Sequence, residues 1–333
     1  MSEFKVGVSS GLFGKDGKPC FDENILRSVS EHSKINMVIM EEAKTHISAQ
    51  DAEQFDAVYL MLERADYDHI NTPKRKLKLI ARHGVGFDTI DIEGMSRLGV
   101  MVTNTPVAVR RPVATMAITL LLSLSHRLIE KHHLTRSGRW AENADYMGTG
   151  LSHKVLGILG AGSIGSEILR LVAPFDMQLQ ACDPNIDADH LKMLNTKKVN
   201  AEELFSTSDF VIIATALSEQ TYHFVDAKML GLMKKDASII NVARGPVINE
   251  PDLIDALEQN RLKAAALDVF ETEPVEADNP LLRMDNVITT SHSLCWTEEC
   301  FDNIARDGLG SILSFVAGEM PAYIVNRAAF TEK

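Results

Sequence analysis

The stretch KVLGILGAGSIGSEILRLVAPFDMQLQACDP (residues 154–184) contains an apolar run, a glycine-rich turn, an amphipathic segment and a second apolar run. This order is typical of a β-strand, a tight loop, a helix and a parallel second strand. Gly160, Gly162 and Gly165 form a G-x-G-x-x-G pattern between the first strand and the helix. Such a loop lets the backbone approach a pyrophosphate at the helix N-terminus, where free N–H groups favour anions. The stretch therefore predicts a dinucleotide-binding domain.

Asp183 lies at the end of the second apolar run, directly before Pro184. An acid at this position can accept hydrogen bonds from the adenosine ribose hydroxyls of a dinucleotide. It would repel the 2′-phosphate of NADP, so we predict that the cofactor is NAD. The alternative interpretation is a turn residue, because Asp before Pro is also common in turns.

Short apolar runs alternate with helix-like segments along most of the chain. The predicted strands lie in residues 5–10, 35–40, 56–62, 77–84, 100–105, 154–160, 178–182, 209–216, 237–245, 262–270 and 286–292. This alternation indicates an α/β protein with parallel sheets covered by helices on both faces. A chain of 333 residues is long enough for about two such domains.

Two longer helices are predicted outside this alternation. Residues 113–137 follow Pro112 and contain no Gly or Pro before Gly138, so they predict one helix of about 40 Å, long enough to run between two domains. Residues 297–319 have helical periodicity, and Thr297 precedes acidic residues as an N-cap would.

Charge and cysteine usage restrict the function class. The formal net charge of −12 argues against a nucleic-acid or anionic-membrane partner. No apolar stretch approaches the roughly 18 residues of a membrane span, and the N-terminus does not resemble a secretory signal. The four cysteines contain no C-x-x-C pair, which is typical of a reducing compartment. We therefore expect a cytoplasmic protein.

No metal site is expected from the pattern of histidines. His126, His132 and His133 lie on the predicted long helix without the i, i+4 spacing that would place two ligands on one face.

Polar residues follow three of the apolar strands in the second half of the chain. Arg244, Asp268 with Glu273, and His292 stand at the ends of predicted strands. The carboxyl ends of strands in an open α/β sheet are where ligands bind, so we expect these side chains to share one crevice. A lone histidine is more often a packed strand-end residue, but a guanidinium and an acid beside it change that interpretation. Together they supply an anion anchor and a supported proton donor for carbonyl reduction by hydride.

At this point the chain resembles the D-isomer-specific 2-hydroxyacid dehydrogenases, the family that includes phosphoglycerate, glycerate and D-lactate dehydrogenases. Four blocks carry the resemblance in the family's order: the substrate loop, the cofactor loop, the arginine block and the acid block that precedes His292. They are RHGVGFDTIDIEGMSRLGVMVTNTP (residues 82–106), GILGAGSIG (157–165), INVARGPVINEPDLIDAL (240–257) and ALDVFETEP (266–274).

The resemblance implies a role for each matched residue. Arg244 would bind the substrate carboxylate and polarise the carbonyl, His292 would be the acid/base, and Glu273 would pair with His292. Val85 and Gly86 would offer backbone N–H groups to the carboxylate. The positions implied to contact the cofactor are Gly160, Gly162, Ser163, Ile164, Gly165, Asp183, Thr215, Val242, Ala243 and Asp268.

The resemblance also implies the architecture and the activity. A flavodoxin-like substrate domain, residues 1–104 plus 297–333, would be interrupted by a Rossmann cofactor domain, residues 105–296, and the protein would be a homodimer. The implied function is NAD-dependent interconversion of a D-2-hydroxy acid and its 2-oxo acid. The alternative is an NAD(H)-sensing, corepressor-like binding protein on the same fold. Leu294, Cys295 and Trp296 replace the small residues that usually follow the family's histidine, which leaves the substrate open.

Overall fold

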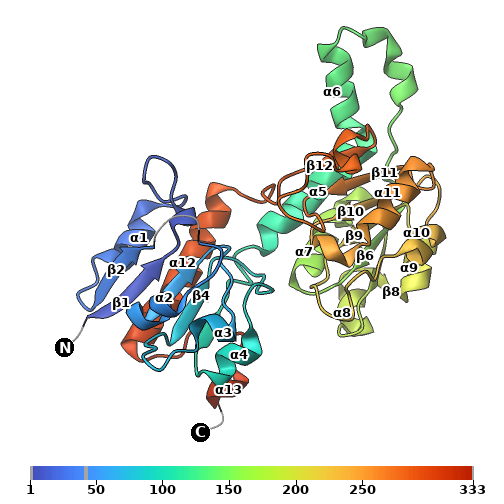
Figure 1. Ribbon diagram of the computed structural model, residues 1–333. Helices are drawn as coiled ribbons and strands as arrows, with labels where there is room; N and C mark the ends of the chain where they lie inside the picture. Colours follow the sequence, from blue (N-terminus) through green and yellow to red (C-terminus); the bar gives the residue numbers. More distant parts are fainter. Residues whose placement is uncertain (1–2, 41–43, 332–333) are drawn as a thin grey trace. The chain divides into compact units, whose positions relative to one another are not determined.

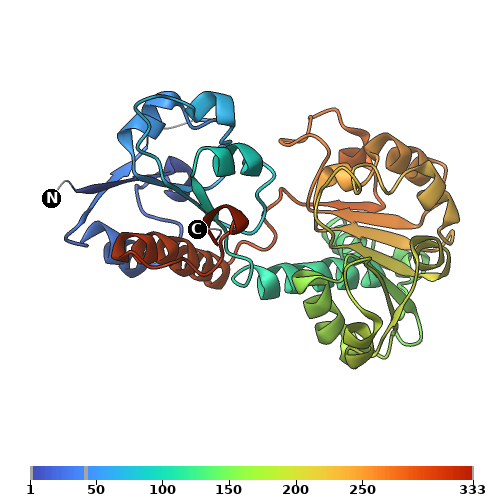
Figure 2. The same cartoon turned by 90° about the horizontal axis from the view of Figure 1, so that it is seen from below.

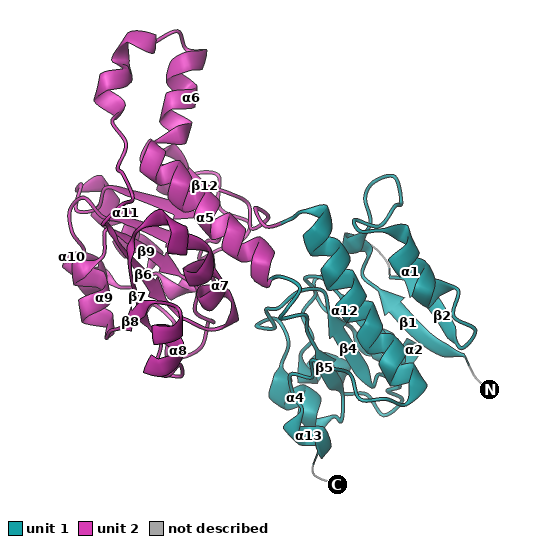
Figure 3. Ribbon diagram, turned by 180° about the vertical axis from the view of Figure 1, so that it is seen from behind, with its two compact units in different colours: residues 1–109, 296–333 teal, residues 110–295 magenta. Residues whose placement is uncertain are grey.

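The computed structural model describes residues 3–40 and 44–331 and divides into two compact units (Figure 3). Unit 1 comprises Met1–Val109 and Trp296–Lys333, and unit 2 comprises Arg110–Cys295. The predicted boundaries lie at 104/105 and 296/297 instead. Residues 104–109 group with unit 1 because the backbone N–H groups of Asn104 and Thr105 donate to carbonyl oxygens of Tyr323 and Gly84.

The sheet of unit 1 has five parallel strands in the order β2-β1-β3-β4-β5. This is the flavodoxin-like order, so the predicted fold of this part is confirmed. The strands are nearly continuous apolar runs, as expected for a sheet covered on both faces. Their bounds are β1 Phe4–Val8, β2 Ile35–Ile39, β3 Ala57–Leu60, β4 Leu79–Arg82 and β5 Met101–Thr103.

Helices cover both faces of this sheet (Figure 2). Helix α12, from the C-terminal part of the chain, packs on β3, β4 and α1, so segments from both ends of the sequence share one layer. The predicted N-cap of α12 is confirmed, because the Thr297 side chain accepts the N–H of Cys300 at 3.2 Å. The helices are α1 Glu23–Ser30, α2 Ala49–Gln54, α3 Tyr67–Ile70, α4 Ile92–Arg97, α12 Glu298–Ala317 and α13 Ala328–Thr331, with a 3₁₀ turn η1 Ser10–Leu12.

The sheet of unit 2 has seven parallel strands in the order β12-β11-β10-β9-β6-β7-β8. Read from β6, this is the Rossmann order with one added strand, and the predicted fold class is confirmed. The strands are β6 Val155–Leu159, β7 Gln178–Cys182, β8 Thr196–Lys198, β9 Phe210–Ile213, β10 Ser238–Asn241, β11 Ala264–Leu267 and β12 Val287–Thr289.

Helices α5 and α7 pack together on one face of this sheet, and α9 to α11 cover the other (Figure 2). Helix α6 and the 3₁₀ helix η2 form an arm that extends away from the sheet of this unit (Figure 1). The bounds are α5 Arg110–His126, α6 Leu128–Arg136, η2 Trp140–Tyr146, α7 Ser163–Val172, η3 Ala173–Phe175, α8 Ala188–Met193, α9 Ala201–Thr207, α10 Ala227–Leu232, η4 Gly245–Val247, α11 Glu250–Glu258 and η5 Pro280–Arg283.

The prediction of one unbroken helix over residues 113–137 is wrong. Arg127 adopts a left-handed conformation (φ 52°, ψ 48°), and α5 and α6 meet there at 59°. The guanidinium of Arg127 donates to Glu130 Oε1 at 3.0 Å and lies over the Tyr146 ring at 4.8 Å. Contacts of Arg127 with Glu130 of α6 and with Tyr146 of η2 therefore stabilise the bend. No Gly or Pro within the helical segment indicates this break in the sequence.

Strand β8 is absent from the sequence prediction. It has three residues, two of them exposed lysines, at the edge of the sheet beside β7. Its polar, short sequence lacks the apolar run by which the other strands are recognised. Short edge strands with exposed lysines disfavour pairing with the edge of another sheet and so oppose aggregation.

Among residues 3–40 and 44–331, no single helix is both long and apolar enough to cross a membrane. The bent pair α5 and α6 reaches that length and composition only when the two helices are taken together.

Candidate functional site

The carboxyl ends of six strands in unit 2 carry all the site residues predicted within that unit. The residues follow β6, β7, β9, β10, β11 and β12. Because these strands are parallel, their carboxyl ends lie along one edge of the sheet. The structure therefore places the predicted glycine loop, the acids, the arginine and the histidine on the same side of unit 2.

The three glycines of the loop after β6 have three different structural roles. Gly160 has φ 91°, and a Cβ there would lie 2.7 Å from the backbone of Thr215. Gly162 is the N-cap of α7, and beyond its immediate chain neighbours and the adjoining helix backbone no heavy atom lies within 4 Å of where its Cβ would be. A Cβ on Gly165 would lie 2.1 Å from the carbonyl oxygen of Gly160. The loop thus combines a tight turn, an open approach and close helix packing, which is the arrangement that admits a pyrophosphate.

Asp183 contacts the glycine loop directly. Its Oδ2 accepts the backbone N–H of Ala161 at 2.8 Å, and its Oδ1 accepts the N–H of Asn185 at 2.8 Å. Each carboxylate oxygen retains a further lone pair, so the side chain can still accept a hydroxyl from a ligand. Ser163 and Ile164 form the first turn of α7, where backbone N–H groups lack partners within the helix.

Asn241 at the end of β10 shapes the turn that carries Arg244. Its Oδ1 accepts the N–H of Ala243 at 3.0 Å, and its Nδ2 donates to the carbonyl oxygen of Arg244 at 2.9 Å. The Arg244 guanidinium donates to the carbonyl oxygen of Ala243 at 2.7 Å. Asn241 is absent from the predicted site, although an Asn that ends a strand before a turn is the local signal for such a role. Val242 and Ala243 are buried in this turn.

The turn after β12 holds His292 in a left-handed conformation (φ 52°). The His292 N–H donates to the carbonyl oxygen of Asp268 at 2.8 Å. The buried Asp268 carboxylate accepts the Thr290 hydroxyl at 2.6 Å and the N–H groups of Ser293 and Leu294 at 3.3 Å each. Non-glycine residues with this backbone persist only where neighbouring groups hold them. Asp268 therefore fixes the histidine turn; its predicted contact with the cofactor stays a prediction.

His292 and Glu273 form a hydrogen-bonded pair. His292 Nδ1 lies 2.7 Å from Glu273 Oε2, and Glu273 Oε1 accepts the N–H of Phe270 at 3.0 Å. The pKa of the Glu273 carboxyl is lowered from its ordinary value. Burial alone would raise this pKa, but the hydrogen bonds from His292 and Phe270 and the charges of His292 and Arg244 outweigh it. An ionised Glu273 keeps the proton on Nδ1, which leaves Nε2 of His292 for proton exchange.

Val85 and Gly86 belong to unit 1 and follow β4. The Asn104 side chain donates to the carbonyl oxygen of Val85 at 2.8 Å, and the N–H of Thr105 donates to that of Gly84 at 3.0 Å. These two hydrogen bonds hold the loop through its carbonyl oxygens. The assignment of Val85 and Gly86 to substrate binding stays a prediction.

His83, which precedes this loop, is a buried group of different character. Its Nδ1 lies 2.5 Å from the hydroxyl of Tyr59. Burial, with a smaller effect from the charge of Arg82, lowers the pKa of His83 to about 3. The imidazole is therefore neutral at physiological pH, and it packs against the rings of Phe21, Tyr59 and Phe301.

Metal ligands do not gather in the part of the chain that the structure describes. Within residues 3–40 and 44–331, no group of three or more His, Cys, Asp or Glu side chains could hold a metal ion.

A family model for the D-isomer specific 2-hydroxyacid dehydrogenase NAD binding domain matches residues 118–293. Among curated proteins, a glyoxylate reductase of Thermococcus onnurineus is 33% identical over 313 residues, which cover 92% of this chain and 93% of the relative. A glyoxylate reductase of Korarchaeum cryptofilum is 33% identical over 255 residues, 76% of this chain and 77% of the relative.

Solved structures with the same fold include three informative examples. The TT0316 protein of Thermus thermophilus superposes with a TM-score of 0.85 at 24% identity, covering 96% of this chain and 99% of that one. D-lactate dehydrogenase of Escherichia coli gives 0.77 at 24% identity, with coverage of 96% and 99%. An NAD-dependent formate dehydrogenase of Staphylococcus aureus in complex with NAD gives 0.80 at 28% identity, with coverage of 95% and 96%.

Proposed function

The chain belongs to the D-isomer-specific 2-hydroxyacid dehydrogenases, which are NAD-dependent enzymes, and we propose that it uses His292, Glu273 and Arg244 for catalysis. In this proposal His292 is the acid/base, Glu273 is its carboxylate partner, and Arg244 anchors the carboxylate of a D-2-hydroxy acid or its 2-oxo acid. The hydrogen bond between His292 Nδ1 and Glu273 is the observation that carries the proposal.

The residues of unit 2 fit the cofactor. Gly162 leaves open space at the N-terminus of the ten-residue helix α7, where the dipole and free N–H groups favour a pyrophosphate. Asp183 lies beside this loop, with acceptor capacity for ribose hydroxyls. The cofactor residues proposed from the resemblance also include Thr215, Val242, Ala243 and Asp268. When bound, the reduced nicotinamide supplies the hydride that adds to C2 of the 2-oxo acid.

The protein groups have complementary tasks in this reaction. Arg244 would meet the substrate carboxylate with its planar fork and polarise the carbonyl oxygen. Protonated His292 would deliver the Nε2 proton to that oxygen as the C–H bond forms, and would itself become neutral. Glu273 remains ionised and stabilises the imidazolium before the transfer. In the oxidative direction the neutral imidazole takes the hydroxyl proton, so the two directions need opposite protonation states of His292. Val85 and Gly86 are proposed to donate backbone N–H groups to the carboxylate.

Steady-state assays with NADH and a panel of 2-oxo acids, including glyoxylate, hydroxypyruvate and pyruvate, test the proposed function. We expect steady NADH oxidation with at least one of them, and D-configuration of the product from hydroxypyruvate or pyruvate; glycolate, the product from glyoxylate, is achiral. An NAD(H)-sensing, corepressor-like protein would instead bind NADH without turnover. Binding without oxidation of NADH across the whole panel would favour that alternative.

Cofactor preference follows from Asp183. We expect kcat/KM with NADH to exceed that with NADPH by at least about tenfold, equivalent to about 1.4 kcal/mol, because the 2′-phosphate would face a carboxylate. Parallel assays with both cofactors at a fixed 2-oxo acid concentration measure this ratio. Asp183→Asn removes the charge, so it should narrow the ratio between the two cofactors; because it also loses one of the two oxygens that accept the N–H groups of Ala161 and Asn185, the ratio and not the absolute rate is the readout. Equal efficiency of the wild-type enzyme with both cofactors would remove Asp183 from the ribose site.

Replacing Glu273 with Gln should change the pH dependence of reduction. The neutral amide no longer stabilises protonated His292, so the alkaline fall of the reduction rate should move to lower pH. Single-turnover rates across a pH series measure this, because they report chemistry rather than product release. Glu276→Gln, an exposed acid three residues along the same loop, is the matched control and should keep the wild-type profile.

The same substitution has a consequence for stability at acid pH. Folding lowers the pKa of Glu273, so its ionised form stabilises the fold above the ordinary pKa of 4.5, and this stabilisation is lost as the pH falls through the folded value. The free energy of unfolding of Glu273→Gln should lack this part of the pH dependence.

The rate measurements provide the contradicting outcome. If Glu273→Gln reduced 2-oxo acids with the wild-type pH profile while chemistry was rate-limiting, the role assigned to Glu273 would be wrong.

The remaining expectations concern assembly and location. We propose a homodimer, and the arm of α6 and η2 supports it, because Leu128, Ile129 and Trp140 are large apolar side chains exposed there. A cytoplasmic location and the absence of nucleic-acid and membrane partners remain proposals from the acidic composition and the cysteine pattern.

A further inference from the structure

A second histidine–carboxylate pair lies in unit 2, apart from His292 and Glu273. His223 Nε2 is 2.6 Å from Glu271 Oε1, and both side chains are 26% exposed. His223 lies in the loop after β9, and its ring stacks on Tyr222 with centroids 4.0 Å apart. Glu271 lies in the turn after β11, two residues before Glu273. The pair therefore connects the loop after β9 to the turn that carries Glu273, the proposed partner of His292.

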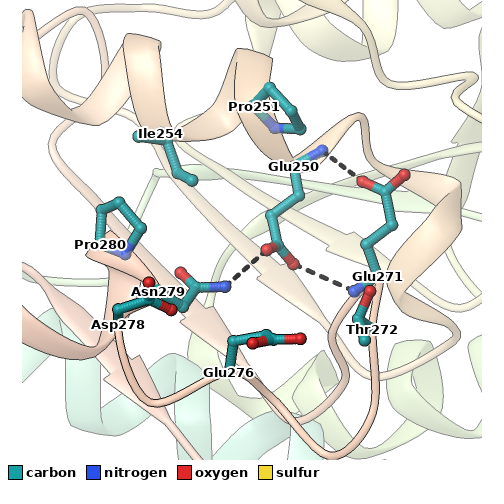
Figure 4. A pocket seen from close by; sticks show the side chains of 9 residues that line it. All are labelled: Glu250, Pro251, Ile254, Glu271, Thr272, Glu276, Asp278, Asn279 and Pro280. Carbon is teal, nitrogen blue, oxygen red and sulfur yellow. Dashed lines mark hydrogen bonds between the residues drawn. The ribbon is translucent and has the colours of Figure 1, made fainter.

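Glu271 is also joined to the start of α11 by two reciprocal hydrogen bonds (Figure 4). The Glu271 N–H donates to Glu250 Oε2 at 3.0 Å, and the Glu250 N–H donates to Glu271 Oε2 at 3.1 Å. Glu250 Oε1 accepts the side-chain amide of Asn279 at 2.7 Å. Two carboxylates thus lie side by side, each satisfied by N–H donors, at the edge of an open pocket of about 560 Å³.

The turn that carries Arg244 touches the same segment through its backbone. A Cβ on Gly245 would lie 1.8 Å from the carbonyl oxygen of Phe270 and 2.4 Å from the nitrogen of Glu271. The N–H of Phe270 donates to Glu273 Oε1. A displacement of residues 270–271 would therefore shift both the Glu273 side chain and Gly245, which follows Arg244.

We propose that Glu271, tied to Glu250 and His223, is a positioning residue that sets Glu273 relative to His292 and Arg244. The proposal rests on the function proposed above. Glu271 does not itself face the reacting groups, since its two oxygens are bonded to His223 and to the N–H of Glu250. It acts through the 270–273 turn, in which the Phe270 N–H holds Glu273 Oε1 while Glu273 Oε2 is hydrogen-bonded to His292 Nδ1.

Glu271→Ala tests this role because it removes both side-chain ties at once. We expect kcat for 2-oxo acid reduction to fall about tenfold, with KM changing less than about threefold, because alignment and not ground-state binding is lost. Glu271→Gln should recover part of kcat. Its amide oxygen can accept the Glu250 N–H, but its NH₂ can donate to His223 Nε2 only when Nδ1 carries the proton, and Nδ1 faces the side-chain nitrogen of Asn249 at 3.3 Å.

A second measurement does not depend on turnover. ¹³C NMR of the glutamate carboxyls, with Glu273 assigned by loss of its signal in Glu273→Gln, gives the pKa of Glu273. In the wild type it should lie below the ordinary 4.5, because His292, Phe270 and Arg244 favour the ionised form over the opposing effect of burial. In Glu271→Ala it should rise as the hydrogen bonds to His292 and Phe270 are weakened. Failure of the wild type to reduce any 2-oxo acid would overturn the proposed function and leave this readout intact.

Asp209→Ala is the matched control. Asp209 also accepts a backbone N–H, that of Val155 at 2.8 Å, and pairs with Lys234 at 3.1 Å, but it precedes β9 at the opposite end of the strands. It should lower thermal stability without changing kcat or the pKa of Glu273. The same pattern in Glu271→Ala, stability lost with kcat and the Glu273 pKa unchanged, would overturn the proposal. Should that variant not fold, His223→Ala removes one tie and must still raise the pKa of Glu273.

Discussion

Replacing His292 with Asn is expected to reduce turnover by roughly a thousandfold in both directions, within the range that a positioned general acid contributes. Asn is the informative substitution because residue 292 has φ 52°, a left-handed backbone that Asn tolerates better than Ala. Its amide cannot donate and reaccept a proton at physiological pH. The N–H of residue 292 can still donate to the Asp268 carbonyl oxygen, so the turn should be retained.

Binding of NADH separates loss of chemistry from loss of fold. The Kd for NADH, measured by its fluorescence, should change by less than about threefold, because the glycine loop and Asp183 lie after other strands. His153→Asn is the matched control, since His153 is an exposed histidine of the same unit with φ 64°. Near-normal turnover in His292→Asn would return His292 to the role of a strand-end residue satisfied by Glu273.

The parts of the fold that the sequence predicts correctly are those with a local pattern. The apolar runs of β6 and β7, the three glycines and Asp183 lie within 31 consecutive residues, and their spacing alone predicts a strand, loop, helix and strand. Thr297 likewise predicts the start of α12, because an N-cap side chain bonds to a backbone N–H only three positions along the chain. Each of these features depends on neighbours that the sequence places side by side.

The features that the sequence does not predict depend on contacts between distant segments. The left-handed Arg127 is held by Glu130 and by the ring of Tyr146, and nothing in the helical segment itself interrupts the helix pattern. Glu271 meets Glu250 and His223 across 21 and 48 residues of sequence. A hydrogen bond between distant residues produces no periodic pattern in the sequence. Such residues can therefore be identified only from the folded structure.

The candidate site shows the same division. His292, Glu273 and Arg244 stand out in the sequence because charged groups at strand ends are unusual neighbours for apolar runs. The structural roles of the groups that hold them in place are not visible in the sequence. Asp268 is noticed there as a strand-end acid, but not as the acceptor of three hydrogen bonds in the turn of His292. Asn241, which shapes the turn of Arg244, is absent from the predicted site because it is a typical turn residue.

Replacing Arg244 with Lys is expected to lower kcat/KM for 2-oxo acids by about a hundredfold, equivalent to about 2.7 kcal/mol. A guanidinium can meet a carboxylate with two parallel hydrogen bonds and still direct charge toward the adjacent carbonyl, whereas an ammonium is a point charge with rotating donors. The turn itself should persist, because Asn241 binds the backbone of residues 243 and 244 and not the guanidinium. Both KM and kcat should therefore worsen, KM through weaker anchoring and kcat through poorer polarisation of the carbonyl.

Oxalate, a dicarboxylate that cannot be reduced by hydride, measures the anchoring part alone. Its inhibition constant should rise in Arg244→Lys, while the Kd for NADH should stay close to the wild-type value. Arg170→Lys is the control, since Arg170 is a half-exposed arginine of α7 that pairs with Glu167 away from the strand ends. If oxalate inhibition and kcat/KM were both unchanged in Arg244→Lys, the substrate carboxylate would have to be bound by another residue. The hydrogen bond between His292 and Glu273 orients the proton donor but does not hold the substrate, so it could not by itself place the carbonyl beside His292.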